Sequence, residues 1–493
     1  MDKRYGKFCF FILSIMMLTF AAVPVSVSAK SDKLSEDNLY ATQEFSSHLP
    51  LIVIQFKDKD DPAYVALESN WLQDEWLLNS VISVYDNSSG AENDLHGEPN
   101  LTVISKIQQL ADWETENREK HDYYIRLEDS TGQAAEHELL GLPANMGSMY
   151  DKSLIRNYIG YTLAAEIMDN APKVQFCEVL LQTEEGLLYQ GVYLLIERTY
   201  AETGVYIKRL SQETGGIPLY TQYTQTFTGL GCLTIPFYEQ EQTEADILQL
   251  TQDLSYVEDV LASNDTTRFL QYKNLIDESS FVNYFIVNEL LGNYDAALNT
   301  FYSYQSTRKH LLQAGPVWNF ERSLDNEVDT PMELAEIPLA QTPFYADLIK
   351  SMDFVDTLKR RYKELASGSI SANRLIDLID STVEYLGPAQ ARDWARWEYR
   401  YQYDPLTSLE PYSTGGSEPA RLRQTKSYEQ EITKMKYVLR EHSLQIAEAI
   451  PLLYSEKGMI TKADNYERNT RLFVVFFAVF MLAIAFAKRQ NLK

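Results

Sequence analysis

The sequence predicts an α+β protein with two lobes, a strand-rich N-terminal lobe and a helical C-terminal lobe, plus one C-terminal transmembrane helix. Short runs of β-branched and aromatic residues dominate before residue 200, whereas apolar residues recur with the 3.6-residue period of helices beyond about residue 240. A charge-free apolar run lies close to the C-terminus. With 493 residues, of which 45% are hydrophobic, the chain can bury a large core and is too long to be one small binding module.

The composition argues against several classes of function. Acidic residues outnumber basic ones 70 to 44, and the formal charge of −26 makes nucleic acid a poor partner. The six histidines lack the HExxH spacing of a zinc site, and no P-loop, dinucleotide fingerprint or Gly-x-Ser-x-Gly motif occurs. Three cysteines are too few for a disulfide scaffold. Beyond the N-terminal segment only Cys177 and Cys232 remain, and the sequence leaves open whether they form a disulfide or stay free thiols.

The N-terminus has the features of a secretory signal peptide. Basic residues precede an apolar run at 8–25, and the small residues at 27–29 suit cleavage by signal peptidase. We interpret 1–29 as a cleaved signal and 30–47 as a polar tether. An uncleaved N-terminal anchor is the alternative, because the apolar run exceeds the length of about 7 to 15 residues typical of a signal.

The apolar run at 472–487 predicts a transmembrane helix at 471–488, since it contains no charged residue and basic residues flank it. At about 1.5 Å per residue it reaches roughly 24 Å, and snorkelling side chains with local thinning can match it to a hydrocarbon core of about 30 Å. Residues 456–470 are then juxtamembrane, and the basic segment 489–493 is a cytoplasmic tail. These features predict a single-pass protein of the cell membrane whose bulk lies outside the cell. A buried core helix is the alternative.

The elements of the N-terminal lobe, 48–200, are predicted from short apolar runs bounded by turn residues. Asp151 precedes a run with helical spacing and is expected to cap that helix. Two later runs flank an acidic segment that contains glycine, which predicts a hairpin. The strands are expected at 51–56, 81–85, 123–127, 174–181 and 191–197, and the helix at 154–170.

The C-terminal lobe, 201–455, is predicted to be mainly helical because apolar residues recur there every three to four positions. Two short extended pieces are expected between the helices. The helices are predicted at 245–263, 277–291, 344–365, 371–386 and 428–453, and the extended pieces at 300–312 and 316–320.

A series of short segments, each weakly specific alone, follows an order and spacing typical of one protein family. These segments are 84–87 (VYDN), 139–143 (LLGLP), 151–158 (DKSLIRNY), 171–179 (APKVQFCEV), 189–197 (YQGVYLLIE), 281–295 and 315–318 (GPVW). Through them the chain resembles the spore coat protein H (CotH) kinase-like family, an atypical branch of the protein-kinase fold, over roughly residues 80–400. The resemblance implies a bilobal kinase-like fold.

The resemblance also implies ATP-dependent phosphorylation of serine or threonine on a cell-surface or coat protein, with Mg²⁺ as the metal. Such a transfer needs an acid beside the acceptor hydroxyl, oxygen ligands for Mg²⁺ and a cation on the phosphates. Asp295 resembles the catalytic Asp of the family, and Asn299 resembles a ligand on the metal side. Without the resemblance they would be an ordinary helix-end Asp and a loop Asn.

The chain departs from the family pattern where nucleotide and metal are bound. The family's Trp-Asp-Phe-Asp is Trp-Asn-Phe-Glu here, so the candidate metal ligands become Asn319, which lacks the charge, and Glu321, which is longer. Bulky and acidic residues at 110–114 replace a loop that faces the phosphates in the family. Lys120 is left as the candidate phosphate lysine, and Glu197, at the end of the strand before the hinge, is a second candidate for cofactor binding.

Arg156 and Asn157 lie on a helix expected to face this site, in supporting roles. Two functions therefore stay open: an active kinase that uses ATP and Mg²⁺, or a pseudokinase that serves as a binding or scaffolding module at the cell surface. The departures favour the second function, because they fall selectively on the nucleotide and metal motifs.

Overall fold

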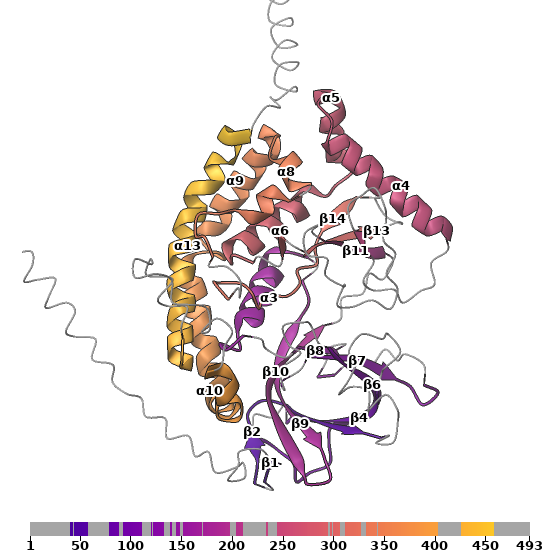
Figure 1. Cartoon of the computed structure of the whole chain (residues 1–493), viewed down its shortest axis with the longest axis vertical. Coiled ribbons are helices and arrows are strands. Elements are labelled where there is room, and N and C mark those ends of the chain that lie inside the picture. Colours follow the sequence, from indigo (N-terminus) through magenta and orange to yellow (C-terminus); the bar gives the residue numbers. More distant parts are fainter. Residues whose placement is uncertain are drawn as a thin grey trace, which may run out of the picture.

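A computed structural model describes most of the predicted lobes. The residues described are 40–42, 44–57, 78–87, 92–110, 120, 122–132, 139–140, 144–147, 151–169, 171–197, 204–210, 233–234, 244–293, 296–297, 299–305, 311–326, 332–342, 344–402 and 425–457. The structure is α+β, with a curled sheet beneath a group of helices (Figure 1).

Among the described residues, the N-terminal lobe contains a sheet of eight strands in the order β1-β10-β8-β7-β6-β4-β3-β9. Because β9 pairs in parallel with β3 and antiparallel with β10, the sheet curls back on itself. Alternate residues of the strands point inward and form a buried core of branched and aromatic side chains. The strands are β1 Tyr40–Ala41, β3 Leu51–Phe56, β4 Leu78–Tyr85, β6 Leu101–Leu110, β7 Asp122–Glu128, β8 Ala144–Gly147, β9 Val174–Gln182 and β10 Leu187–Glu197.

Strand β6 is the main element of this lobe that the sequence analysis missed. Its inward face alternates apolar and polar residues, Val103, Ser105 and Ile107. The hydroxyl of buried Ser105 is hydrogen-bonded, since it lies 2.8 Å from the hydroxyl of Ser80 on the neighbouring strand β4. A polar residue on the core face weakens the period-2 pattern from which strands are predicted.

Residues 40–42 and 44–47, predicted from sequence to be part of a tether, contribute to the fold. Strand β1 pairs with β10, and β2 Ser46–Ser47 pairs with β5 Asn93–Asp94. Phe45 between them is fully buried and lies with its ring centroid 5.6 Å from that of Tyr189.

The helical lobe packs around α6, which is buried on nearly all sides. Asp277 caps α6 as its carboxylate accepts from the amides of Ser279 and Ser280. The predicted helix at 344–365 is two helices, because Ser351 caps the second one. The helices are α3 Arg156–Ile167, α4 Glu244–Leu261, α5 Thr266–Phe269, α6 Glu278–Leu290, α8 Tyr345–Leu348, α9 Met352–Ala366, α10 Ala372–Gln402 and α13 Tyr428–Lys457, with 3-10 turns η1 Leu270–Asn274 and η2 Pro338–Gln341.

The predicted end of this helix at 386 is confirmed by a break at Gly387, whose backbone is not helical (φ 41°). A second helical segment follows the kink at Gly387–Pro388, and the label α10 covers both segments. The part beyond the kink packs against β10, so α10 runs from the helical lobe to the sheet (Figure 1).

A small second sheet lies beside the helices in the order β12-β11-β13-β14. Strand β13 lies in the segment predicted to be extended at 300–312, β14 begins at the end of that segment, and 316–320 is a loop. The strands are β11 Gly204–Leu210, β12 Leu233–Thr234, β13 Asn299–Gln305 and β14 Leu312–Ala314.

Helix α3 connects the two lobes, since it packs on both β9 and α6. The helix begins at Arg156 and its N-cap is Ile155. The prediction that Asp151 is the N-cap is therefore wrong. Leu154 adopts φ 64°, which folds the chain back so that the Asp151 carboxylate still accepts from the Arg156 amide at 2.9 Å.

The transmembrane helix in the predicted fold class is corrected by the structure. No helix within the described ranges is both long enough and apolar enough to cross a membrane. The long helices α10 and α13 pack one face on the protein and carry charged residues along the other. The predicted span at 471–488 and signal at 1–29 lie outside the described residues.

Candidate functional site

The two segments that the sequence assigns to chemistry meet in the structure. Just after α6, the side-chain amide of Asn293 donates to the backbone carbonyl of Asn319 at 3.0 Å and to Asn288 Oδ1 at 2.9 Å. The Leu324 amide donates to the carbonyl of Leu291 at 2.9 Å. The segment leading to Asp295 therefore lies against the loop that contains Asn319 and Glu321.

For two of the predicted site residues the structure gives little or no geometry. Asp295 lies outside the described residues. Asn299 begins β13, where its backbone is paired with Leu210, and its side chain is not described.

Both candidate metal ligands in the loop are oriented by neighbouring polar groups. Asn319 Oδ1 accepts from the Glu321 amide at 3.0 Å, an Asx turn. Asn157 of α3 accepts from the Phe320 amide at 2.6 Å and donates to the half-buried Glu321 carboxylate at 3.4 Å. Asn157, which was predicted to have a supporting role, thus binds both the backbone and a side chain of the loop.

The loop rests directly on α3 through an aromatic contact. The Phe320 ring packs edge-on against Tyr161, with centroids 5.5 Å apart. It also covers Gly160, where a Cβ would lie 2.2 Å from Phe320 Cγ. Glycine at this helical position leaves the space that the ring occupies.

The backbone around this loop is strained. Six non-glycine residues in the described part of the chain have positive φ; three of them lie in the loop at 319–325, and a fourth lies two residues before Arg156. Such conformations cost about 1–3 kcal/mol each and persist only where the surroundings hold them. The four residues are Leu154, Asn319, Leu324 and Asp325.

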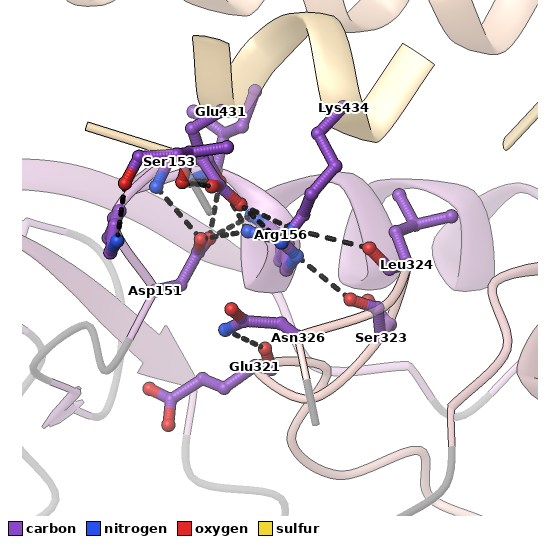
Figure 2. Close-up of polar contacts among 12 residues, drawn as sticks. Asp151, Ser153, Arg156, Glu321, Ser323, Leu324, Asn326, Glu431 and Lys434 are labelled. Carbon is purple, nitrogen blue, oxygen red and sulfur yellow. Dashed lines mark hydrogen bonds and ion pairs between the residues drawn. The ribbon is translucent and has the colours of Figure 1, made fainter. Parts of the chain in front are cut away.

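The buried guanidinium of Arg156 holds this strained loop (Figure 2). It donates from Nε to the carbonyl of Ser323 at 2.8 Å and from Nη2 to that of Leu324 at 3.3 Å. It also forms ion pairs with Asp151 and, at 2.7 Å, with Glu431 of α13. Arg156 therefore joins α3, the loop and α13 in one network.

A second cation extends the network from α13. Lys434 lies 3.4 Å from the Glu431 carboxylate and donates to the carbonyl of Asp325 at 3.1 Å. Burial alone would raise the pKa of Glu431, but Lys434 and Arg156 hold it well below its usual range. The charges are thus compensated inside the protein.

The two candidates for cofactor binding lie in the sheet lobe. Lys120 is buried, and its ammonium lies 2.6 Å from the carboxylate of Asp393 on α10. Glu197, at the end of β10, accepts from the Lys173 amide at 2.9 Å. No local pattern singles out Asp393, because it is 273 residues away from Lys120 in sequence.

Helix α13 also contacts the end of α6 through His442. The two ring nitrogens lie 2.5 Å from the carbonyl of Glu289 and 2.7 Å from that of Leu334. The Glu289 side chain is itself buried and accepts from the Leu339 amide at 2.5 Å. Burial raises the pKa of Glu289 to about 8, although the Leu339 amide opposes this rise.

We expect Glu289→Gln to remove a pH dependence of stability. The folded state binds the Glu289 proton more tightly than the unfolded state, so this stabilisation is complete below about pH 4.5 and is lost as the pH rises through about 8. Between these values the free energy of unfolding should fall by about 1.4 kcal/mol per pH unit from this group. Urea unfolding at about pH 5.5, 6.5 and 7.5, inside this window, measures the slope. Glu448→Gln, at an exposed position of α13, is the control. An unchanged slope in Glu289→Gln would contradict the role of this carboxyl.

The family comparison matches the region that contains this site. A family model described as CotH kinase protein matches residues 112–443, about two thirds of the chain. The match includes the loop, α3 and the part of α13 that contains Glu431 and His442. No curated protein matches the chain.

Proposed function

The chain belongs to the CotH kinase protein family, and on this basis we propose that it transfers the γ-phosphoryl group of ATP to serine or threonine hydroxyls of a surface or coat protein. The observation that carries the proposal is the contact of Asn293 with Asn319. It brings the segment leading to Asp295 beside the loop that contains Glu321, as positioning for phosphoryl transfer requires.

In this proposal Asp295 accepts the proton of the attacking hydroxyl. Asn299, Asn319 and Glu321 would hold Mg²⁺, which supplies neutralisation of phosphate charge when bound. The donor chemistry fits such an ion, because these side chains offer oxygen atoms. Nearby, the buried Asn293 Oδ1 accepts no hydrogen bond within the described part of the chain. Lys120 would contact the phosphates.

A second candidate function, a pseudokinase that binds or scaffolds a surface partner, is favoured by another observation. The candidate ligand groups that are described already have protein partners. Lys120 pairs with Asp393, Glu321 with Asn157, and Glu197 with the Lys173 amide. These residues can therefore stabilise the fold without a nucleotide.

Nucleotide binding separates the two functions. For a kinase, we expect millimolar ATP with Mg²⁺ or Mn²⁺ to raise the melting temperature of the purified chain, and radiolabelled phosphate to be incorporated into the chain or an acidic, serine-rich protein. Asp295→Asn should keep the ATP-dependent shift and lower incorporation by about 10²-fold or more, because it removes only the base. The exposed Glu448→Gln is the matched control. Absence of an ATP-dependent shift in the wild type would reject the kinase and leave the scaffold.

A further inference from the structure

The loop that contains Glu321 ends in a left-handed turn. Leu324 and Asp325 are successive residues with φ 51° and 61°. L-residues adopt this conformation mostly one at a time, so two in succession need support from outside the turn. The turn therefore keeps its shape only while its neighbours hold it.

Two buried cations hold the turn through three successive backbone carbonyls. Arg156 donates to the carbonyls of Ser323 and Leu324 at 2.8 and 3.3 Å. Lys434 of α13 is buried as well and donates to the next carbonyl, that of Asp325, at 3.1 Å. Hydrogen bonds from charged donors are stronger than those from neutral ones. Helix α13, which follows the turn by about a hundred residues, thus supplies part of the support for the loop.

The turn in its turn fixes the backbone of Glu321, a candidate metal ligand. Asn326 follows the turn directly and donates from Nδ2 to the carbonyl of Glu321 at 2.7 Å. The Asp325 carboxylate accepts from the Met332 amide at 2.9 Å, which holds the chain after the turn. Figure 2 shows the Glu321 carboxylate pointing away from the buried cations. The cations therefore act on the backbone of the loop, and Asn326 passes this constraint to Glu321.

We propose that Lys434 is a positioning residue for Glu321, because it holds the turn from which Asn326 binds the Glu321 backbone. The inference rests on the proposed function, in which Glu321 would hold Mg²⁺, and it adds α13 to the elements that set the geometry of this ligand. Groups that orient a metal ligand contribute to metal affinity although they do not touch the metal.

The charge of Lys434 gives this inference a distinctive sign. An ammonium has no lone pair and cannot itself bind a cation, so Lys434 affects metal affinity only through the loop or through its charge. Removal of a nearby positive charge by itself favours binding of a cation. Loss of positioning weakens that binding, so the two effects act in opposite directions.

Mn²⁺ binding to the full chain, measured by electron paramagnetic resonance with and without ATP, tests the inference. We expect Lys434→Met to raise the dissociation constant of Mn²⁺ about 10-fold, as loss of a group that orients a metal ligand implies. Hydrogen exchange of the 319–326 amides should be faster in the same variant, with or without metal, because the turn loses one of its supports.

A second variant and a control separate positioning from general destabilisation. Asn326→Ala removes the bond to the Glu321 carbonyl without changing a charge or altering α13, so it tests the same connection if Lys434→Met folds poorly. It should also raise the dissociation constant of Mn²⁺, and the double variant should lie within about 2-fold of Lys434→Met, because the two residues act in series. Lys436→Met on the same helix is the matched control, since Lys436 pairs with the exposed Asp380. It should change neither Mn²⁺ affinity nor exchange of the loop.

The outcomes distinguish this inference from the proposed function. If the wild type binds Mn²⁺ but either Lys434→Met or Asn326→Ala binds it as tightly or more tightly, the positioning role is wrong and the proposed function stands. The same holds if the two single effects multiply in the double variant. If the wild type binds neither Mn²⁺ nor ATP, the proposed function and this inference fail together.

Discussion

Arg156→Met is expected to lower the free energy of unfolding by about 3–5 kcal/mol, because it removes the guanidinium from two buried carboxylates and leaves Glu431 with Lys434 alone. Asp151 and Glu431 both pair with the guanidinium in a site that excludes solvent. Methionine fills much of the volume but donates no hydrogen bond to the carbonyls of Ser323 and Leu324. The effect should therefore combine a charge penalty with release of the strained loop.

Urea unfolding at pH 7 measures the loss, and hydrogen exchange of the 319–326 amides reports the loop. Arg374→Met is the control, since Arg374 forms an ion pair with Glu166 in which both side chains are at least 30% exposed. Exposed pairs contribute about 0–1 kcal/mol. The difference in the free energy of unfolding between wild type and Arg156→Met should narrow as the pH falls below about 4.5. The pKa of Glu431 is lowered in the folded wild type, so the stabilisation from this carboxylate is complete above its unfolded pKa and is lost as the pH falls towards its folded pKa. A loss below about 1 kcal/mol at pH 7 would show that other contacts hold the loop.

Gly191→Ala should lower the free energy of unfolding by about 2–4 kcal/mol, the second largest effect that we expect. Gly191 has φ 105°, a conformation that costs an L-residue about 1–3 kcal/mol. A Cβ there would also lie 2.2 Å from Asp393 Oδ2. That oxygen cannot yield easily, because Lys120 and Val192 both donate to it.

Gly132→Ala is a matched control for the backbone contribution. Gly132 has φ 81°, and nothing lies within 4 Å of a Cβ built on it. Gly132→Ala should lower the free energy of unfolding by about 1 kcal/mol. The additional destabilisation in Gly191→Ala then measures the steric clash with Asp393 of α10. Equal losses in the two alanine variants would mean that Asp393 moves aside freely and that the contact of α10 with β10 is not rigid.

Local patterns in the sequence were sufficient for most helices and for several strands. The predicted strand at 51–56 and the predicted helix at 277–291 correspond to β3 and α6, because burial of one face imposes a period that neighbouring residues reveal. The pattern failed at β6, where buried Ser105 interrupts the apolar face, and it did not reveal the second helical segment of α10, which follows the kink at Gly387.

In the candidate site, too, the sequence reveals the segments, whereas the contacts between them depend on the tertiary structure. The order of short segments identified the family. The segments around Asn293 and Asn319 are each defined by contiguous residues, so the sequence could single them out. Their actual contact, and the use of Asn157 to orient Glu321, depend on how α3 lies beneath the loop. No sequence pattern contains that placement.

Composition, periodicity and contiguous motifs thus sufficed for the α+β class, the family and the segments that contain the candidate chemistry. The long-range partners of the buried charges came from packing alone. Arg156 meets Glu431 275 residues later, and Lys120 meets Asp393 273 residues later. The physical reason is desolvation: once the lobes close, each buried charge must be compensated by whichever opposite charge the fold brings beside it, and that depends on long-range geometry.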